Sequence, residues 1–313
     1  MSVYIHCGLR SPIGVLNGQY KHMRPEVLGA KVIDALINCH SISQVDGLFC
    51  GNAVGTGGNI GRLMGLMCNL PNSVPAITVD MQCASALMSI EMAYTHIASG
   101  VMDAVIAGGI ESSSLQPERV YALGDDRKGT YKVAQFTPQD QSPLAMLEGA
   151  ERTIYKHNVT KEDLYPHIIG SHQRASAALD NSYLQSYIMP ITIDGKRCID
   201  ECIRPKMNEK LLSRMKPLLG ADSITNAGNA CLTHDGAAFV YLSNKKGPFK
   251  IHSVKPWAGN PQFSPEGALE STEAILKRTG LTMDDIDVVE WNEAFAIIDV
   301  LFDKAYPNYT GKY

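Results

Sequence analysis

Two stretches of this chain, far apart in the sequence, share one spacing of apolar residues. Without a gap, residues 33–53 lie over residues 274–294. In each copy a helix-like pattern leads through a turn into an apolar strand that opens with an aspartate, Asp46 or Asp287. The identity between the copies is low, so these positions alone leave chance agreement open. The matched helix–strand spacing nevertheless predicts a fold built from two similar βαβ halves.

The first third of the chain alternates between apolar runs and helix-like stretches, which is the pattern of an α/β protein. We expect strands and helices over residues 3–7, 27–38, 47–50, 74–80, 84–99 and 104–107. The glycine-rich turn over residues 51–61 lacks the GxGxxG and GxxxxGK[ST] spacings of nucleotide-binding loops. We interpret this turn as tight backbone packing, with a phosphate cradle as the alternative.

A looser region follows, from about residue 115 to residue 233. Turn signals there separate charged helical patterns over residues 144–156 and 163–179. Because these patterns carry apolar faces, we interpret the region as an inserted domain and not as a linker. A buried strand is predicted to return over residues 235–242.

The overall charge and the cysteine pattern exclude several classes of protein. The 313 residues carry a net charge of −4 and are 45% hydrophobic, which is typical of a globular protein without attraction to nucleic acid or anionic membranes. No apolar run approaches the roughly 18–20 residues of a membrane span, and the N-terminus lacks a signal-peptide pattern. The eight cysteines show neither disulfide-framework nor zinc-ligand spacing. We therefore expect a cytoplasmic protein with reduced thiols and no metal site.

One of these cysteines, Cys83, lies where the predicted strand over residues 74–80 runs into the helix-like stretch over residues 84–99. The partial positive charge of a helix N-terminus stabilises a thiolate, so a cysteine at such a junction can act as a nucleophile. The small residues that follow it, Ala84 to Ala86, leave room for a substrate carbonyl. The alternative is a buried cysteine that serves packing alone.

Five segments of the chain together resemble the thiolases, which make or cleave a carbon–carbon bond between acyl groups on coenzyme A. The segments are RSPIG at residues 10–14, VPAITVDMQCASA at 74–86, AGGIES at 107–112, TNAGNACLTHDGAA at 225–238 and NEAFA at 292–296. The resemblance implies the thiolase fold, an α/β architecture of duplicated βαβαβ halves layered α-β-α-β-α with an inserted loop domain. It implies a first half over residues 1–115 and 234–248, a loop domain that binds coenzyme A over 116–233, and part of a second half over 249–313.

The resemblance also implies roles for particular residues. Cys83 stands in the place of the family's nucleophile, which holds the acyl group as a thioester. Asn292 stands in the place of the asparagine that holds a water against the thioester oxygen, and a turn or capping role is its alternative. Ketosynthases commonly have a histidine there, so Asn292 favours a thiolase. The residues that would contact the pantetheine arm, or else simply belong to the core, are Met146, Ala227, Cys231, Ala294 and Phe295.

The chain departs from the family pattern after NEAFA. Thiolases carry there a Gly-His-Pro histidine that activates the nucleophile and a second cysteine in a Cys-x-Gly segment. Residues 297–313 contain neither, and no histidine lies beyond His252. We therefore expect a longer protein or a truncated, C-terminally incomplete product, and little activity from these residues alone. The family's Cys-Gly-(Ser/Ala)-Gly is also altered, because Ala84 and Ala86 replace glycines and crowd the nucleophile.

The expected function is therefore a thiolase-type acyltransferase. It would join acyl-CoA and acetyl-CoA into 3-ketoacyl-CoA and CoA, or run in reverse, through an acyl-enzyme on Cys83. The alternative is a catalytically impaired protein of thiolase fold that binds acyl-CoA or a partner chain, and a ketosynthase-like condensing enzyme is disfavoured. The resemblance further implies fatty acid metabolism, a homodimer or homotetramer, and coenzyme A thioesters as substrates without a permanently bound cofactor. Neither nucleic acid nor membrane is expected as a partner.

Overall fold

The chain divides into two compact units. In a computed structural model, the described residues are 1–55, 57–135, 138 and 142–313. The first unit comprises Met1–Lys132, Leu179–Cys202 and Thr233–His252, and the second comprises Val133–Ala178, Ile203–Leu232 and Ser253–Tyr313. These units cross the predicted domain bounds, because residues 179–202 of the predicted insertion pack with the first unit. The three-domain division stays a prediction.

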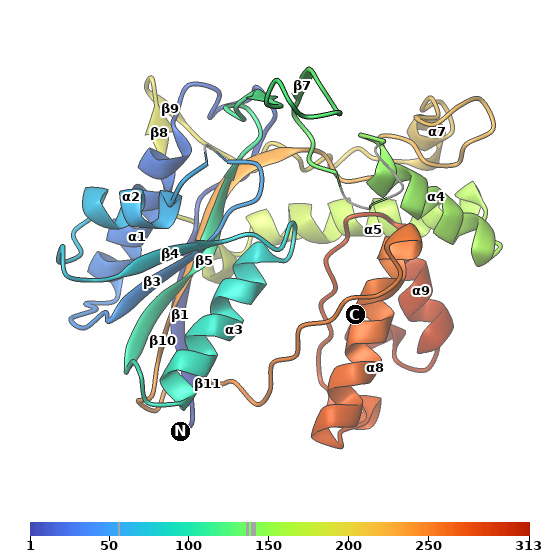
Figure 1. Cartoon of the computed structure of the whole chain (residues 1–313). Coiled ribbons are helices and arrows are strands. Elements are labelled where there is room, and N and C mark those ends of the chain that lie inside the picture. Colours follow the sequence, from blue (N-terminus) through green and yellow to red (C-terminus); the bar gives the residue numbers. More distant parts are fainter. Residues whose placement is uncertain (56, 136–137, 139–141) are drawn as a thin grey trace. The chain divides into compact units, whose positions relative to one another are not determined.

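A mixed sheet organises the first unit (Figure 1). Among the described residues it has seven strands in the order β11-β1-β10-β5-β3-β4, with β2 beside β10. They are β1 (Tyr4–Arg10), β2 (Gly14–Val15), β3 (Gly47–Gly51), β4 (Ala76–Val79), β5 (Ala104–Ser112), β10 (His234–Ser243) and β11 (Phe249–Lys250). Strand β3 runs parallel to its neighbours β4 and β5, whereas β10 runs antiparallel to β5 and β1. The strands predicted from the alternating pattern are confirmed.

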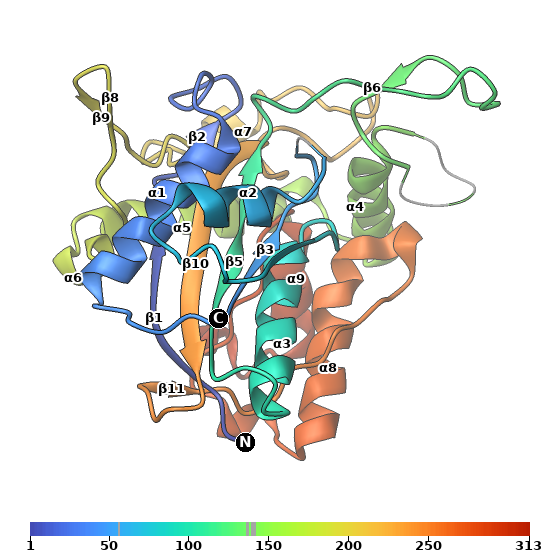
Figure 2. The same cartoon turned by 60° about the vertical axis from the view of Figure 1, so that its left-hand side comes forward.

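Helices cover both faces of this sheet (Figures 1 and 2). Helices α1 (Pro25–Cys39) and α2 (Ile60–Met67) lie against one face and α3 (Ser85–Ala98) against the other. Successive residues of β3 serve opposite faces, as a strand requires: Leu48 packs with α1 and α2, and Phe49 packs with α3. Helix α2 was not predicted, although Asn59 caps it by accepting a hydrogen bond from the Arg62 amide at 3.0 Å.

Short elements complete the first unit. Strand β6 (Arg119–Val120) pairs with β7 (Thr130–Tyr131), β8 (Thr192–Ile193) pairs with β9 (Lys196–Arg197), and α6 (Ser182–Gln185) is a single helical turn. In the β6–β7 hairpin the rings of Tyr121 and Tyr131 stack with 4.4 Å between centroids, and Leu123 is fully exposed. This hairpin therefore presents apolar side chains to its surroundings.

The second unit is helical. Its elements are α4 (Ala145–Lys156), α5 (Lys161–Leu179), α7 (Glu209–Leu212), η1 (Pro261–Glu266), α8 (Gly267–Thr279), η2 (Met283–Asp285), α9 (Ile297–Ala305) and η3 (Thr310–Lys312). Leu164 of α5 and Phe302 of α9 are fully buried in one apolar core, where Trp291 meets the Phe302 ring edge-on at 5.1 Å. No helix in the described part of the chain is long and apolar enough to cross a membrane.

The second copy of the predicted repeat forms its helix but not its strand. Helix α8 matches the expected helix, yet the described residues that follow η2 join no sheet, so the strand expected to open at Asp287 is wrong. In the first copy, β3 hydrogen-bonds to a strand on each side. In the second, the Val289 amide donates to the Lys312 carbonyl at 2.7 Å, which gives one bond and no ladder. An apolar strand pattern without neighbouring strands does not form a β-strand.

Candidate active site

Cys83 lies on an exposed turn between β4 and α3. Gln82, just before it, has a left-handed backbone with φ of 51°. The Ser85 hydroxyl fixes the turn by accepting from the Met81 amide at 2.8 Å and donating to the Gln82 carbonyl at 2.5 Å. Cys83 is exposed, so the alternative of a buried packing cysteine is wrong. The thiol stands at the start of a helix and is open to an incoming group, which is the geometry that a nucleophile needs.

The start of α3 is held directly against the sheet. The Ser89 hydroxyl, fully buried, accepts from the Gly108 amide at 2.9 Å and donates to the Gly108 carbonyl at 2.8 Å. Only small residues allow this approach: a Cβ on Gly109 would lie 3.0 Å from the Ala86 Cβ. The glycines of the AGGIES motif therefore allow the start of α3, next to the Cys83 turn, to pack closely on the sheet.

Gly51, at the end of β3, makes a testable contact with this helix. A Cβ there would lie 2.4 Å from the Ala86 nitrogen and the Ser85 carbonyl carbon, both backbone atoms. We expect Gly51→Ala to push α3 outward and to lower the free energy of unfolding by about 1–3 kcal/mol. Chemical denaturation measures this change. Gly65→Ala is the matched control, since its Cβ would meet the Leu48 side chain at an ordinary 3.4 Å and alanine favours the helix. Equal losses in both variants would contradict the expected contact.

Glu111, the acid of AGGIES, holds the glycine-rich loop after β3. Its carboxylate accepts from the Asn52 side chain at 2.9 Å, the Ala53 amide at 2.8 Å and the Val54 amide at 3.0 Å. Arg119 adds a bond to the Gly55 carbonyl at 2.9 Å. Two amides that could have bound a phosphate are thus already used, which supports tight packing and not a phosphate cradle.

The N-terminal RSPIG segment is held by an ion pair. Arg10 donates two bonds of 2.8 Å to the two carboxylate oxygens of Asp200, and the Ile13 amide donates to Asp200 at 2.7 Å. Burial raises the pKa of the Asp200 carboxyl, but the bonds from Arg10 and Ile13 outweigh it and hold the pKa below its usual range. This pair joins β1 to residues 179–202 within the first unit.

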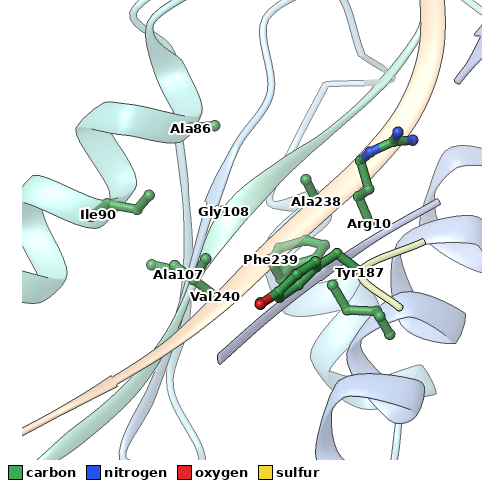
Figure 3. A pocket seen from close by; sticks show the side chains of 11 residues that line it. Arg10, Ala86, Ile90, Ala107, Gly108, Tyr187, Ala238, Phe239 and Val240 are labelled. Atoms are coloured by element: carbon green, nitrogen blue, oxygen red, sulfur yellow. The ribbon is translucent and has the colours of Figure 1, made fainter. Parts of the chain in front are cut away.

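An apolar hollow of about 250 Å³ lies on the α3 face of the sheet in the first unit (Figure 3). Ala86 and Ile90 of α3 form one wall, and the strand β10 contributes Ala238 and Val240. Arg10 is the charged residue at its rim, and its guanidinium is already paired with Asp200. The hollow can therefore accept an apolar group and offers little to a polar one.

In the second unit, NEAFA and TNAGNAC run side by side. The Cys231 amide donates to the Ala294 carbonyl at 2.8 Å, and the Ala296 amide donates to the Asn229 carbonyl at 2.9 Å. Ala230 and Phe295 form an isolated antiparallel bridge between these two bonds. The structure thus brings together the predicted site residues Cys231, Ala294 and Phe295.

The Asn292 side chain is exposed at the start of this paired segment. The backbone carbonyl of Asn292 accepts from the Ala294 amide at 2.8 Å, which makes a tight turn. Phe295 is 7% exposed and belongs to the apolar core, whereas Ala227 and Cys231 are exposed and Met146 and Ala294 are partly buried against that core. Six of the seven predicted site residues thus lie in the second unit and Cys83 lies in the first, and the roles of all seven stay predictions.

Glu151 of α4 binds the start of the TNAGNAC loop (residues 225–231) through its carboxylate. Its carboxylate accepts from the Ile224 amide at 2.8 Å, the Thr225 amide at 2.7 Å and the Thr225 hydroxyl at 2.5 Å. Burial raises the pKa of this carboxyl, but the bonds from Thr225 and Ile224 outweigh it and lower the pKa overall. Glu111 and Glu151 were not predicted as functional positions, although Glu111 is the acidic residue of the AGGIES segment.

His234, at the start of β10, is a half-buried histidine of the first unit. Its buried Nε2 has no hydrogen-bond partner among the described residues, and burial lowers its pKa although Asp235 opposes the shift. The described residues also contain no cluster of three or more histidine, cysteine or acidic side chains placed to hold a metal ion.

Comparison with known proteins decides the family. The sequence model described as "Thiolase, N-terminal domain" matches residues 3–246 of this chain. The chain belongs to the thiolase family. Its membership in this family of acyl-transferring enzymes, predicted from the five segments, is therefore confirmed.

Relatives and a solved structure agree with this assignment. A Staphylococcus epidermidis protein named "Putative acetyl-CoA C-acetyltransferase VraB" is 30% identical to this thiolase over 305 residues, which cover 92% of this chain and 78% of the relative. A Staphylococcus haemolyticus protein of the same name is 30% identical over 304 residues, covering 92% of this chain and 79% of the relative. The crystal structure of the Bacillus anthracis acetyl-CoA acetyltransferase has a TM-score of 0.89 at 24% identity and covers 98% of this chain and 83% of that one. The predicted thiolase fold is confirmed.

Proposed function

We propose that this chain transfers acyl groups between coenzyme A thioesters with Cys83 as the nucleophile. The observation that carries the proposal is the position of Cys83, exposed at the start of a helix that glycines and Ser89 hold against the sheet. The proposed substrates are acyl-CoA and acetyl-CoA, and the products are 3-ketoacyl-CoA and CoA, or the reverse. No permanently bound cofactor is needed for this chemistry.

In the first step, the Cys83 sulfur attacks the thioester carbonyl carbon of an acyl-CoA. A carbon–sulfur bond to Cys83 forms, the bond to the coenzyme A sulfur breaks, and the thiol proton of Cys83 ends on coenzyme A. In the second step, the α-carbon of acetyl-CoA loses a proton and attacks the acyl carbonyl carbon, which forms the carbon–carbon bond. The carbon–sulfur bond to Cys83 breaks, and the proton lost by the α-carbon ends on the Cys83 sulfur, so the thiol is restored. We assign to Asn292 a water that hydrogen-bonds the thioester oxygen, and to Met146, Ala227, Cys231, Ala294 and Phe295 contacts with the pantetheine arm.

A second candidate function is an impaired thiolase that binds acyl-CoA or a partner chain without turnover. One observation favours it: Ala84 and Ala86, which stand where the family pattern has glycines, place two methyl groups close to the Cys83 sulfur. Methyl groups beside the sulfur would hinder the approach of a thioester carbonyl. Acylation would then be slow and carbon–carbon bond formation absent.

One experiment separates the two functions. The protein is incubated with acetyl-CoA, its intact mass is followed over time, and the modified peptide is located. In parallel, cleavage of acetoacetyl-CoA by added coenzyme A is measured. Acetyl on Cys83 together with turnover supports the acyltransferase; acyl-CoA binding without either supports the impaired protein. Acetyl on another residue alone would overturn the assignment of Cys83.

We also propose a homodimer or homotetramer that works in cytoplasmic fatty acid metabolism. The supporting observation for self-association is the β6–β7 hairpin, which presents an exposed Leu123 and a 72% exposed Val120. Exposed apolar groups of this kind are typical of protein contacts. Light scattering after size-exclusion chromatography measures the mass in solution, and a monomer at micromolar concentration would contradict the proposal.

A further inference from the structure

The first unit contains a second cavity, of about 750 Å³, which shares no lining residue with the apolar hollow beside α3. One wall is formed by residues 18–24 and the first turns of α1. The other wall is formed by the β8–β9 hairpin and the residues that follow it, up to Glu201. A cavity of this size can hold a whole small molecule.

Hydrogen bonds hold the two walls of this cavity together. The Gln19 side chain binds the Ile199 backbone twice: its Nε2 donates to the carbonyl at 2.8 Å, and its Oε1 accepts from the amide at 3.0 Å. The Glu201 carboxylate accepts from the Gln19 amide at 3.1 Å. In the hairpin, Asp194 and Gly195 both have a positive φ, as a tight two-residue turn requires. A ligand therefore meets walls that are already ordered, which lowers the entropy cost of binding.

The lining of the cavity carries more positive than negative charge. Its charged side chains are Lys21, Arg24, Lys196 and Arg197, against Asp194 and Glu201. Four positive and two negative groups leave an excess of two positive charges, in a chain whose net charge is −4. Of the four cations, only Arg24 forms an ion pair within the described residues, at 3.3 Å from Glu26. Unpaired cations gathered around one cavity attract an anion.

The inner surface of the cavity is aliphatic. Met23 and Ile193 line it and also pack against the apolar core of the first unit, and Val27 of α1 lies beside them in the lining. The Gln19 amide could have bound the edge of a base or a sugar hydroxyl, but Ile199 already occupies both of its polar atoms. This surface therefore suits an aliphatic group better than a polar one.

We propose that this cavity binds an alkyl diphosphate, a small molecule with an aliphatic body and two linked phosphate groups. The body lies against Met23 and Ile193, and the phosphate oxygens accept hydrogen bonds from Lys196 and Arg197 of the hairpin and from Lys21 of the facing wall. A diphosphate is long enough to use cations of both walls, and lysine and arginine are common phosphate ligands in proteins. Binding is reversible and includes no covalent step. The site does not rest on the proposed acyl transfer, because the two share no residue.

Calorimetric titration of the full chain compares three compounds: geranyl diphosphate, inorganic pyrophosphate and ADP. Geranyl diphosphate should bind at least roughly tenfold more tightly than pyrophosphate, because its aliphatic body adds buried apolar surface. ADP should bind more weakly than geranyl diphosphate, because its body is polar. The proposal is overturned by equal affinities for geranyl diphosphate and pyrophosphate, or by no binding of geranyl diphosphate at millimolar concentration.

A double variant on the hairpin tests where the diphosphate binds. Lys196→Ala with Arg197→Ala removes two exposed cations of the cavity and should weaken geranyl diphosphate binding by roughly tenfold or more. Lys245→Ala with Lys246→Ala is the matched control, since it removes two exposed cations of the same unit outside the cavity. Its affinity should stay within roughly twofold of the wild type, because distant surface charges are screened by salt. Equal losses in both variants would show attraction to the overall charge and overturn the site.

A third variant tests the aliphatic surface. Ile193→Asn should weaken the binding of geranyl diphosphate and leave that of pyrophosphate unchanged, since only the first compound has a body to bury. A loss of affinity for both compounds, or for neither, would contradict the proposed orientation. Acetylation of Cys83 is followed in the same proteins and should match the wild type. A protein that binds geranyl diphosphate but is not acetylated would refute the proposed function alone, and the opposite result would refute this site alone.

Discussion

Replacing Cys83 with serine should abolish the covalent acetyl adduct and lower acyl transfer by roughly 10³-fold or more, as loss of an enzyme nucleophile does. The reason is chemical: a serine hydroxyl is a far weaker nucleophile than a thiolate. Cys83 is an exposed, free cysteine, and the substitution exchanges one side-chain atom of similar geometry. We therefore expect Cys83→Ser to fold as the wild type does. Intact mass after incubation with acetyl-CoA checks this result.

Cys39→Ser is the matched control. Cys39 ends α1, is exposed like Cys83 and belongs to the same unit, but it has no place in the proposed chemistry. It should keep both the acetyl adduct and the turnover. If Cys83→Ser still carries one acetyl group and Cys39→Ser does not, the nucleophile has been assigned to the wrong cysteine.

At the turn around Cys83 the secondary structure could be predicted from the sequence, whereas the side-chain contacts could not. Its position between a strand and a helix follows from the change from a run of β-branched residues to a helical period, and the structure has β4 and α3 within two residues of the predicted bounds. Ser85 was interpreted only as a small residue beside the nucleophile. In the structure its hydroxyl bonds to Met81 and Gln82 and fixes the turn. A side-chain bond of this kind depends on the φ of Gln82, which composition does not reveal.

Long-range partners account for what could not be predicted. Glu111 lies 57 and 58 residues from the amides it holds, and Glu151 lies 73 and 74 residues from its own. A local pattern carries no signal of such pairs. The strand expected at Asp287 failed for the same reason: its apolar spacing was right, but strand formation depends on neighbours that the pattern does not contain.

The largest structural effect is expected at Glu151. In Glu151→Ala, the buried amide of Thr225 and the amide of Ile224 lose their acceptor, and each unsatisfied donor costs about 1–3 kcal/mol. We therefore expect the free energy of unfolding to fall by about 3–5 kcal/mol. Glu151→Gln keeps one oxygen but turns an amide donor toward the loop amides, so it should lose part of this amount. Urea denaturation at neutral pH measures the free energy of unfolding of the wild type, Glu151→Ala and Glu151→Gln.

The pH dependence of stability shows whether the ionised Glu151 carboxylate is what stabilises the loop. Because the folded-state pKa of Glu151 lies below its usual value, its contribution is present above the unfolded pKa of about 4.5 and is lost as the pH falls through the folded value. The wild type should therefore lose stability in acid more steeply than Glu151→Gln does. Glu162→Ala is the control, since the Glu162 side chain is 63% exposed and lies 3.8 Å from Lys161, and the substitution should change stability by less than about 0.5 kcal/mol.

Ala227 and Cys231, the proposed contacts of the pantetheine arm, follow in the loop that Glu151 holds. Coenzyme A should therefore also bind more weakly to Glu151→Ala. Unaltered stability in Glu151→Ala would mean that the loop is held by other contacts.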